Sequence, residues 1–305
     1  LSSSSAASDV YKRQVQKKAV QLTFHRCDGS TWQKTTLAKG SSYSLPGVRD
    51  AEGYTFMGWS TKPMQSVSPQ YEAEEKITVN GNVDLYAVVF NRTTETDLTE
   101  DQLPQVDIYK YKQVIFVGDS RTEFMENVLT GMGESATKNV KFVCSAGKGL
   151  DWFTTTGWAQ LYSIVQHDSN SILSKKTAVI FNFGVNDLSK SADYAEYYNW
   201  IAPQLKSKGC ELYFMSVNPV NRLMLPNAGR ADRSEAAVRS FNQYMKANLS
   251  SAYTYIDMYS YLKSTGYSFA SDHYGTGTVD DGLHYTTRTY KRIFAKCMDS
   301  LRVPA

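Results

Sequence analysis

The chain has 305 residues, of which 42% are hydrophobic and 21% are charged, and its formal net charge is +3. This length is enough for about two domains that each bury a core of their own. The small net charge excludes a strongly basic nucleic-acid-binding surface, and no apolar run approaches the roughly 20 residues that a membrane-spanning helix needs.

The first residues differ in character from the rest of the chain. They begin Leu1-Ser-Ser-Ser-Ser and resemble translated read-through of a sequencing adapter at the end of a metagenomic fragment. We therefore expect residues 1–14 to be non-native or disordered, and the natural amino terminus, with any signal peptide, to be missing. The lack of a visible signal peptide then carries no information about localisation.

Residues 15–90 have the pattern of a small all-β module. Apolar and polar side chains alternate over residues 19–27, as in a half-buried strand. Residues 53–61 form an aromatic strand edged by glycines, and the turn Asn80-Gly81-Asn82 predicts a hairpin over residues 77–90. A module of this size can fold alone.

Two short motifs give this module a family resemblance. The run Tyr54-Thr-Phe-Met-Gly-Trp-Ser-Thr61, followed by Leu85-Tyr86-Ala87, resembles the Listeria–Bacteroides repeat, the internalin B-repeat type with a β-grasp-like fold. The resemblance implies an exported or wall-attached protein in which the repeat is a spacer or an adhesive. Trp59 fits either a ligand platform or the core, and we expect the core because so small a domain needs its large side chains inside.

The next segment, residues 91–110, is polar, acidic and poorly periodic, which indicates a linker with one short turn. From residue 111 to residue 305, apolar strands alternate with amphipathic helices. The predicted strands begin near residues 114, 141, 177, 211 and 253, and the last predicted helix spans residues 290–301. This alternation predicts a three-layer α/β domain around a parallel sheet.

A serine follows the first of these strands. Residues 114–117 are apolar and run into Gly118-Asp119-Ser120, so Ser120 lies at the carboxyl edge of the sheet, where open α/β folds bind ligands. Ser120 also forms a capping-box pattern with Glu123, which requires no catalysis. This stretch alone leaves a nucleophile and a helix cap as alternatives.

A serine nucleophile needs a histidine base and an orienting acid, and the chain has four histidines. His25 and His167 fit surface positions, whereas His273 and His284 flank a glycine-rich loop before the last helix. Asp281 precedes His284 by three residues, a spacing that lets the acid accept from Nδ1–H and leaves Nε2 free. The neighbouring Asp280 is an alternative acid, but the spacing favours Asp281.

Donors for a developing oxyanion are available at two other strand ends. Gly147 follows the second strand and can present a bare backbone N–H, and Asn186 follows the third strand with a side-chain amide. Each residue also fits an ordinary turn.

In chain order these features resemble the four blocks of the SGNH (GDSL-type) hydrolase family over residues 111–305. The blocks are Gly118-Asp119-Ser120, Gly147, Gly184-x-Asn186-Asp187 and Asp281-x-x-His284. The resemblance implies a flavodoxin-like sheet and ester hydrolysis through an acyl-enzyme without a cofactor or metal. It assigns Ser120 as the nucleophile, His284 as the base and Asp281 as its orienting acid. Its oxyanion hole consists of the Ser120 and Gly147 N–H groups and the Asn186 side chain.

Three further residues are candidate substrate contacts. Many family members have Leu or Ile after the serine, whereas this chain has Arg121, as in a subgroup of exported bacterial relatives. Arg121 fits either a solvated residue of the first helical turn or a contact to a substrate carboxylate. Trp152 and Tyr285 lie near the site blocks and fit either stacking on sugar rings or core packing.

The four cysteines, Cys27, Cys144, Cys210 and Cys297, form no CxxC motif or Cys/His cluster, so a zinc site is not expected. Cys144 and Cys297 lie on apolar faces and fit small core residues, but the even count leaves a disulfide open.

Together these observations predict an exported bacterial esterase that removes short acyl groups, such as acetyl, from carbohydrate or cell-wall glycan. The expected location is secreted or cell-surface, with no nucleic-acid partner. Two alternatives use the same sequence features. One is a surface adhesion or wall-binding protein with a catalytically idle α/β domain, and the other is an acyltransferase with the same triad. The sequence makes no prediction of oligomeric state.

Overall fold

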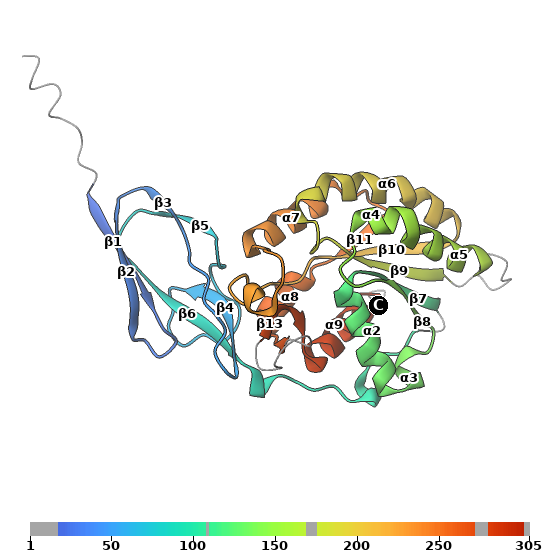
Figure 1. Ribbon diagram of the computed structural model, residues 1–305, viewed down its shortest axis with the longest axis horizontal. Coiled ribbons are helices and arrows are strands. Elements are labelled where there is room, and N and C mark those ends of the chain that lie inside the picture. Colours follow the sequence, from blue (N-terminus) through green and yellow to red (C-terminus); the bar gives the residue numbers. More distant parts are fainter. Residues whose placement is uncertain (1–17, 108–109, 169–175, 272–279, 302–305) are drawn as a thin grey trace, which may run out of the picture.

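The computed structural model describes residues 18–107, 110–168, 176–271 and 280–301 (Figure 1). The predictions for residues 1–14 and for His273 with its glycine-rich loop lie outside these ranges. An amino-terminal β module packs beside a larger α/β domain, and in Figure 1 it lies next to the part of that domain that holds helix α8 (Met258–Thr265) and strand β13 (Asp280–Tyr285).

The β module contains two sheets. Its strands are β1 (Ala19–His25), β2 (Thr31–Ala38), β3 (Ser41–Ser44), β4 (Tyr54–Ser60), β5 (Lys76–Val79) and β6 (Val83–Asn91). Four of them form a mixed sheet in the order β2-β1-β6-β4, in which β1 and β6 run parallel, and β3 pairs with β5 in a second sheet. The predicted strands over residues 19–27 and 53–61 are therefore confirmed.

The predicted hairpin over residues 77–90 is wrong. Strand β5 pairs with β3 rather than with β6, and β6 lies between β1 and β4. At the predicted turn, Asn82 Oδ1 accepts a hydrogen bond from the Gln21 backbone N–H at 2.9 Å. The Asn80-Gly81-Asn82 turn thus leads the chain from the β3–β5 sheet into the four-stranded sheet. Strand β6 pairs there with β1 and β4 instead of forming a local hairpin with β5.

The core of the β module contains the apolar face of β1 and the aromatic strand β4. Leu22, Phe24 and Trp59 have no exposed surface, and Trp59 Nε1–H donates to the Pro46 carbonyl at 2.8 Å. Trp59 is therefore a core residue, as expected for a domain of this size. Its ring packs edge-on against Phe24, with ring centroids 4.8 Å apart.

The segment that connects the β module to the α/β domain is hydrogen-bonded to that domain. It contains two short 3₁₀ helices, η1 (Arg92–Thr94) and η2 (Glu100–Gln102). The Glu95 carboxylate is buried and accepts hydrogen bonds from Ser268 Oγ at 2.6 Å and Arg292 Nη1 at 2.9 Å, as well as from Thr289 Oγ1. A segment that the polar composition predicted to be a linker is thus anchored by its own acidic side chains.

The α/β domain has the predicted parallel sheet. Its strands are β7 (Tyr111–Gly118), β8 (Val140–Cys144), β9 (Lys176–Asn182), β10 (Cys210–Met215) and β11 (Tyr253–Ile256). They are all parallel, in the order β11-β10-β9-β7-β8. This is a flavodoxin-like order, and its direction of winding reverses at β7.

Helices cover both faces of this sheet (Figure 1). One face carries α4 (Leu150–Trp152), the π-helical turn η3 (Phe153–Gly157), α5 (Trp158–Asp168), α6 (Ser191–Ser207) and α7 (Glu235–Asn248). The other carries α2 (Ser120–Met132), α3 (Glu134–Thr137), α8 and α9 (Thr287–Ser300). The remaining short helices are η4 (Leu188–Lys190) and η5 (Leu225–Ala228).

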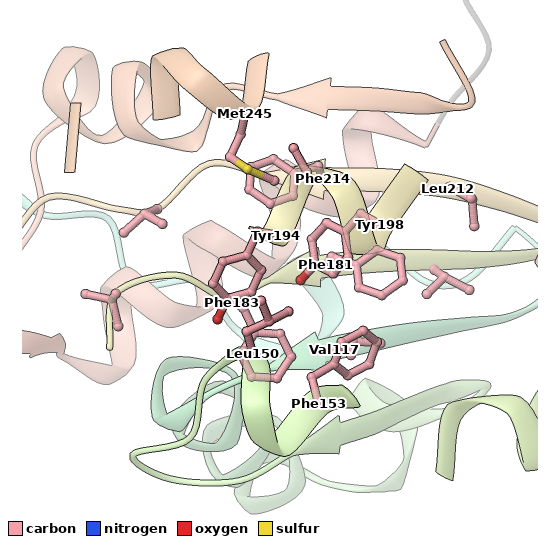
Figure 2. Close-up of a cluster of buried hydrophobic side chains, with 14 of the residues drawn as sticks. Val117, Leu150, Phe153, Phe181, Phe183, Tyr194, Tyr198, Leu212, Phe214 and Met245 are labelled. Carbon is pink, nitrogen blue, oxygen red and sulfur yellow. The ribbon is translucent and has the colours of Figure 1, made fainter. Parts of the chain in front are cut away.

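Two apolar cores follow from the alternation of side chains along β7 and β9. Val117 and Phe181 point to the first face, where they meet Phe153 and Tyr198 in the cluster shown in Figure 2. Phe116 and Ile180 belong to the second core, with residues of α2, α8 and α9. Because the central strands β7 and β9 are buried on both faces, they read in the sequence as continuous apolar runs, whereas the edge strands β8 and β11 expose Lys141 and Thr254.

Helix α8 and the antiparallel pair of β12 (Phe269–Ser271) with β13 were not predicted. Asp281 and His284 therefore lie on a strand, where the sequence indicated a loop. In the described ranges the four cysteines are free thiols, and no helix is long and apolar enough to span a membrane.

Candidate active site

Ser120 begins helix α2 directly after strand β7, at the edge where the sheet changes winding direction. Gly118 is required at this turn, since a Cβ there would lie 2.0 Å from Thr122 Oγ1. Asp119, rather than Ser120, is the N-cap: its carboxylate accepts from the Arg121 N–H at 3.0 Å. Ser120 therefore does not form the capping box with Glu123, and its hydroxyl is left for another partner.

That partner is His284. Ser120 Oγ lies 2.8 Å from His284 Nε2, and His284 Nδ1 lies 2.5 Å from Asp281 Oδ2. Asp281 and His284 are almost completely buried, and the Phe124 ring packs on the imidazole with centroids 4.5 Å apart. The structure thus brings together three residues that are up to 164 positions apart in the sequence, in the hydrogen-bonded order serine, histidine, aspartate.

The turn between Asp281 and His284 is held by the Asp281 carboxylate. Gly282 has a φ of +68°, which lets the chain fold back so that Asp281 Oδ1 accepts from the backbone N–H groups of Leu283 at 2.8 Å and His284 at 2.7 Å. The other carboxylate oxygen, Oδ2, faces the imidazole and also lies 3.5 Å from Arg230 Nη2. Both oxygens of the Asp281 carboxylate therefore have hydrogen-bond partners, and these partners fix the orientation of its plane.

The surroundings set the protonation states that this arrangement needs. Burial lowers the pKa of His284 below its ordinary value of 6.5, and Asp281 offsets only part of this effect. Burial by itself would raise the pKa of Asp281, but the hydrogen bonds from His284 and from the backbone amides outweigh it, so that this pKa lies below 3.8. At neutral pH the pair is therefore a neutral imidazole and a carboxylate, and Nε2 can accept a proton from Ser120.

Gly147 and Asn186 line the same cleft as Ser120. The backbone N–H of Ser120, as the first helical residue, has no partner within the helix. Gly147 adopts a φ of +70°, a conformation that favours glycine. Asn186 Oδ1 accepts from Arg233 Nη2 at 2.7 Å and its Nδ2 donates to the Lys148 carbonyl at 2.8 Å. Because an amide carries two N–H groups, one remains available to a ligand.

Asp187 ties the Gly147 loop to the Asn186 loop. Its Oδ2 accepts from the Leu150 N–H at 2.9 Å and its Oδ1 accepts from the Tyr194 hydroxyl at 2.7 Å. Gly149 packs against this carboxylate so closely that a Cβ would lie 2.3 Å from Oδ2. The two loops that carry the candidate donors are thus positioned together.

The cleft is open to solvent and has a volume of about 230 Å³. Its lining includes Ser120, Phe124, Gly147, Asn186, Arg230, Arg233 and His284. Sequence reasoning missed both arginines, which lie in the loop between η5 and α7 and belong to no motif. Their position in the sequence could have identified them as site residues. Both follow the fourth parallel strand, and loops at the carboxyl ends of parallel strands converge on one edge of the sheet.

The three candidate substrate contacts do not line this cleft. Arg121 is buried, and its Nε, Nη1 and Nη2 donate to the backbone carbonyls of Leu283, Asn218 and Pro219 at 2.9–3.0 Å. Neither the solvated position nor the carboxylate contact expected for Arg121 is therefore found. Tyr285 is buried, with its hydroxyl donating to Pro219 O, and Trp152 packs against the core at Phe183.

Among the described residues, no group of His, Cys, Asp and Glu side chains is placed to hold a metal ion. The chemistry of the cleft is thus carried by one hydroxyl, one imidazole, two guanidinium groups and backbone or amide N–H donors.

Comparisons with known proteins match both parts of the chain. A family model described as Listeria-Bacteroides repeat domain matches residues 21–88, and one described as GDSL-like Lipase/Acylhydrolase matches residues 114–297. The second match covers more than half of the chain. No curated protein sequence matches the chain significantly.

Several solved structures are similar to this chain over about two thirds of its length. A Bacteroides fragilis protein described as an acylhydrolase is 16% identical, covers 66% of this chain and 92% of its own, and has a TM-score of 0.42. A Slackia heliotrinireducens protein described as an SGNH hydrolase is 13% identical, with 63% and 100% covered and a TM-score of 0.43. The catalytic domain of Streptococcus pneumoniae peptidoglycan O-acetyltransferase A is 15% identical, with 63% and 92% covered and a TM-score of 0.38.

Proposed function

Because the chain belongs to the GDSL-like lipase/acylhydrolase (SGNH hydrolase) family, we propose that it hydrolyses carboxylic esters with Ser120, His284 and Asp281 as its catalytic triad. One observation carries the assignment: Ser120 Oγ is 2.8 Å from His284 Nε2, and His284 Nδ1 is 2.5 Å from a buried carboxylate. A serine is activated as a nucleophile when an adjacent base, oriented by a third group, can take its proton.

In the proposed acylation step, Ser120 Oγ attacks the ester carbonyl carbon while His284 Nε2 takes the hydroxyl proton. The bond to the leaving alcohol then breaks, and the imidazolium returns that proton to the alcohol oxygen. Water repeats the sequence on the acyl-enzyme, so that a carboxylic acid leaves and Ser120 regains its proton. Asp281 stays ionised throughout and stabilises the imidazolium, consistent with its low pKa.

We assign the oxyanion hole to the backbone N–H groups of Ser120 and Gly147 and to the Asn186 amide. All three residues line the cleft beside His284. The Ser120 N–H also lies at the positive end of the α2 dipole, which favours a developing negative charge. Arg233 donates a hydrogen bond to Asn186 Oδ1, and this bond orients the Asn186 amide so that Nδ2 points away from Arg233.

For the substrate, we propose short acyl esters, such as acetyl groups, on carbohydrate or cell-wall glycan outside the bacterial cell. The extracellular or surface location is supported by the Listeria–Bacteroides repeat at residues 21–88. A short acyl group suits a solvent-open cleft lined by two arginines better than a long apolar chain does.

The test is hydrolysis of p-nitrophenyl acetate by the full chain, with the variants Ser120→Ala and His284→Ala as matched controls. We expect both variants to lose turnover while circular dichroism shows an unchanged fold. Acetate release from a panel of acetylated polysaccharides and peptidoglycan then identifies the natural ester. Addition of an acceptor sugar separates hydrolysis from acyl transfer, because transfer leaves the acetyl group on the acceptor.

A wild-type rate no faster than that of Ser120→Ala refutes the proposal. That result favours the alternative of a surface adhesion or wall-binding protein with a catalytically idle α/β domain.

A further inference from the structure

The β module contacts the strand that carries the acid and the base. Arg92, at the end of the module, donates through Nη1 to Asp280 Oδ2 at 2.6 Å and through Nη2 to Asp50 Oδ2 at 2.7 Å. Its third nitrogen, Nε, donates to Thr55 Oγ1 at 2.9 Å. Asp280 is the residue directly before Asp281 and the first residue of β13. The guanidinium of Arg92 thus bridges a buried carboxylate of the module and the start of β13.

A second connection runs from Asp50 to the turn within β13. Asp50 Oδ1 accepts from Asn221 Nδ2 at 2.8 Å, and the same Nδ2 also approaches the Val48 carbonyl at 3.1 Å. The Asn221 backbone N–H in turn donates to the Gly282 carbonyl at 2.9 Å. The fit is tight, because a Cβ on Gly282 would lie 2.5 Å from the Asn221 carbonyl oxygen.

The Asp50 side chain is fully buried and hydrogen-bonded through both of its carboxylate oxygens. These two oxygens accept hydrogen bonds from three partners, Arg92, Asn221 and the Phe56 backbone N–H. Charge-assisted hydrogen bonds of this kind are strong and directional when water is excluded. A buried carboxylate with three donors from two parts of the fold sets the distance between those parts.

We propose that Asp50 and Arg92 are positioning residues for Asp281 and His284, so that the β module is a structural component of the active site rather than a spacer. This inference rests on the proposed triad. The acid–base segment is held at three residues, Asp280, Gly282 and Leu283, and the first two of these supports reach the module through Asp50. The third is Arg121, within the α/β domain.

The expected effect is on rate rather than on substrate binding. Neither Asp50 nor Arg92 lines the cleft, so their loss leaves the binding surface intact. A displacement of a catalytic group by about 1 Å can lower the rate roughly 10²-fold. We therefore expect kcat to fall about 10- to 100-fold in Asp50→Asn and Arg92→Gln, with KM changed less than about twofold.

The experiment compares full-length Asp50→Asn, Arg92→Gln and Asp280→Asn with wild type. The control is Arg239→Gln, since Arg239 Nη1 donates to the Ala73 carbonyl of the same module at 2.9 Å without contacting β13. Thermal unfolding shows that each variant is folded at the assay temperature. Asp280→Asn leaves the Asp50–Arg92 pair in place, so it decides the question if the other two variants fail to fold.

A second readout needs no substrate. An imidazole Nδ1–H that donates to a buried carboxylate gives a proton resonance far downfield of the amide protons, assigned here by its loss in His284→Ala. We expect this resonance to broaden or move upfield in the three test variants and to persist in Arg239→Gln. The conservative Arg92→Lys should restore part of kcat, because an ammonium can pair with one of the two carboxylates.

Unchanged kcat and an unchanged downfield proton in the folded test variants overturn the inference. An equal fall of kcat in Arg239→Gln also overturns it, since the effect is then a general loosening of the module. A failure of the proposed function gives a different result, because wild type then shows no turnover. In that case the downfield proton still reports whether Asp50 and Arg92 position His284.

Discussion

Replacing Asn186 by alanine tests the proposed oxyanion hole most directly. The Asn186 amide has two N–H groups, and one donates to the Lys148 carbonyl at 2.8 Å, so a single donor is left for the substrate. Removal of one oxyanion-hole donor costs about 10²–10³ in kcat, or about 2.7–4 kcal/mol. Because this hydrogen bond forms in the transition state, we expect KM to change little.

The same substitution has a small predicted cost in stability. It leaves Arg233 Nη2 and the Lys148 carbonyl without their Asn186 partner, but Lys148 is exposed and Arg233 is half-buried, so water can replace the lost contacts. We expect the free energy of unfolding to fall by about 0.5–1.5 kcal/mol. Loss of activity therefore greatly exceeds loss of folded protein at the assay temperature.

The assay is steady-state hydrolysis of p-nitrophenyl acetate, with urea unfolding measured on the same preparations. Asn186→Asp is the matched variant: it keeps an oxygen for Arg233 but removes the amide donors and adds a negative charge beside the oxyanion. We expect its kcat to fall at least as far as that of Asn186→Ala. A raised KM with kcat preserved refutes the reasoning, because Asn186 then binds the ground-state substrate.

Three other predictions follow from the buried charges. The pKa of His284 lies below 6.5 and the base must be neutral, so kcat/KM should rise with pH to a plateau with its midpoint below 6.5; a midpoint above 7 in a pH–rate profile contradicts this. Lys263 Nζ lies 2.8 Å from Glu72 and 2.9 Å from Glu235, so Lys263→Met removes the paired ammonium from a buried carboxylate, Glu235, and a half-buried one, Glu72. It should lower the free energy of unfolding by about 3–5 kcal/mol, measured by urea denaturation, and a loss below 1 kcal/mol disproves it. Arg121→Met removes the donor from three backbone carbonyls and should lower both stability and kcat; retention of both, by thermal unfolding and the esterase assay, argues against its supporting role.

The sequence by itself determined the architecture of the α/β domain and predicted the residues of the proposed triad. Continuous apolar runs predicted the central strands β7 and β9, because a strand that is covered on both faces needs apolar side chains throughout, and the alternation of strands with helices predicted the parallel sheet. Ser120, Gly147 and Asn186 follow successive parallel strands in the sequence, and this pattern predicts that they lie on one edge of the sheet. Asp281 and His284 were predicted as a pair from their spacing, since a three-residue turn is a local property of the chain.

The tertiary structure decided every feature that depends on partners distant in the sequence. The Asn80-Gly81-Asn82 turn has a local hairpin signal, yet β6 pairs with β1 because the sheet gains more from that long-range register than from the hairpin. Arg121 looked exposed at a helix start, but carbonyls about 100 and 160 residues away surround its guanidinium. Hydrophobic periodicity describes one element at a time and carries no information about which polar groups meet when elements pack. For this reason only the folded chain shows that Asp50 and Arg92 are linked to strand β13, which carries Asp281 and His284.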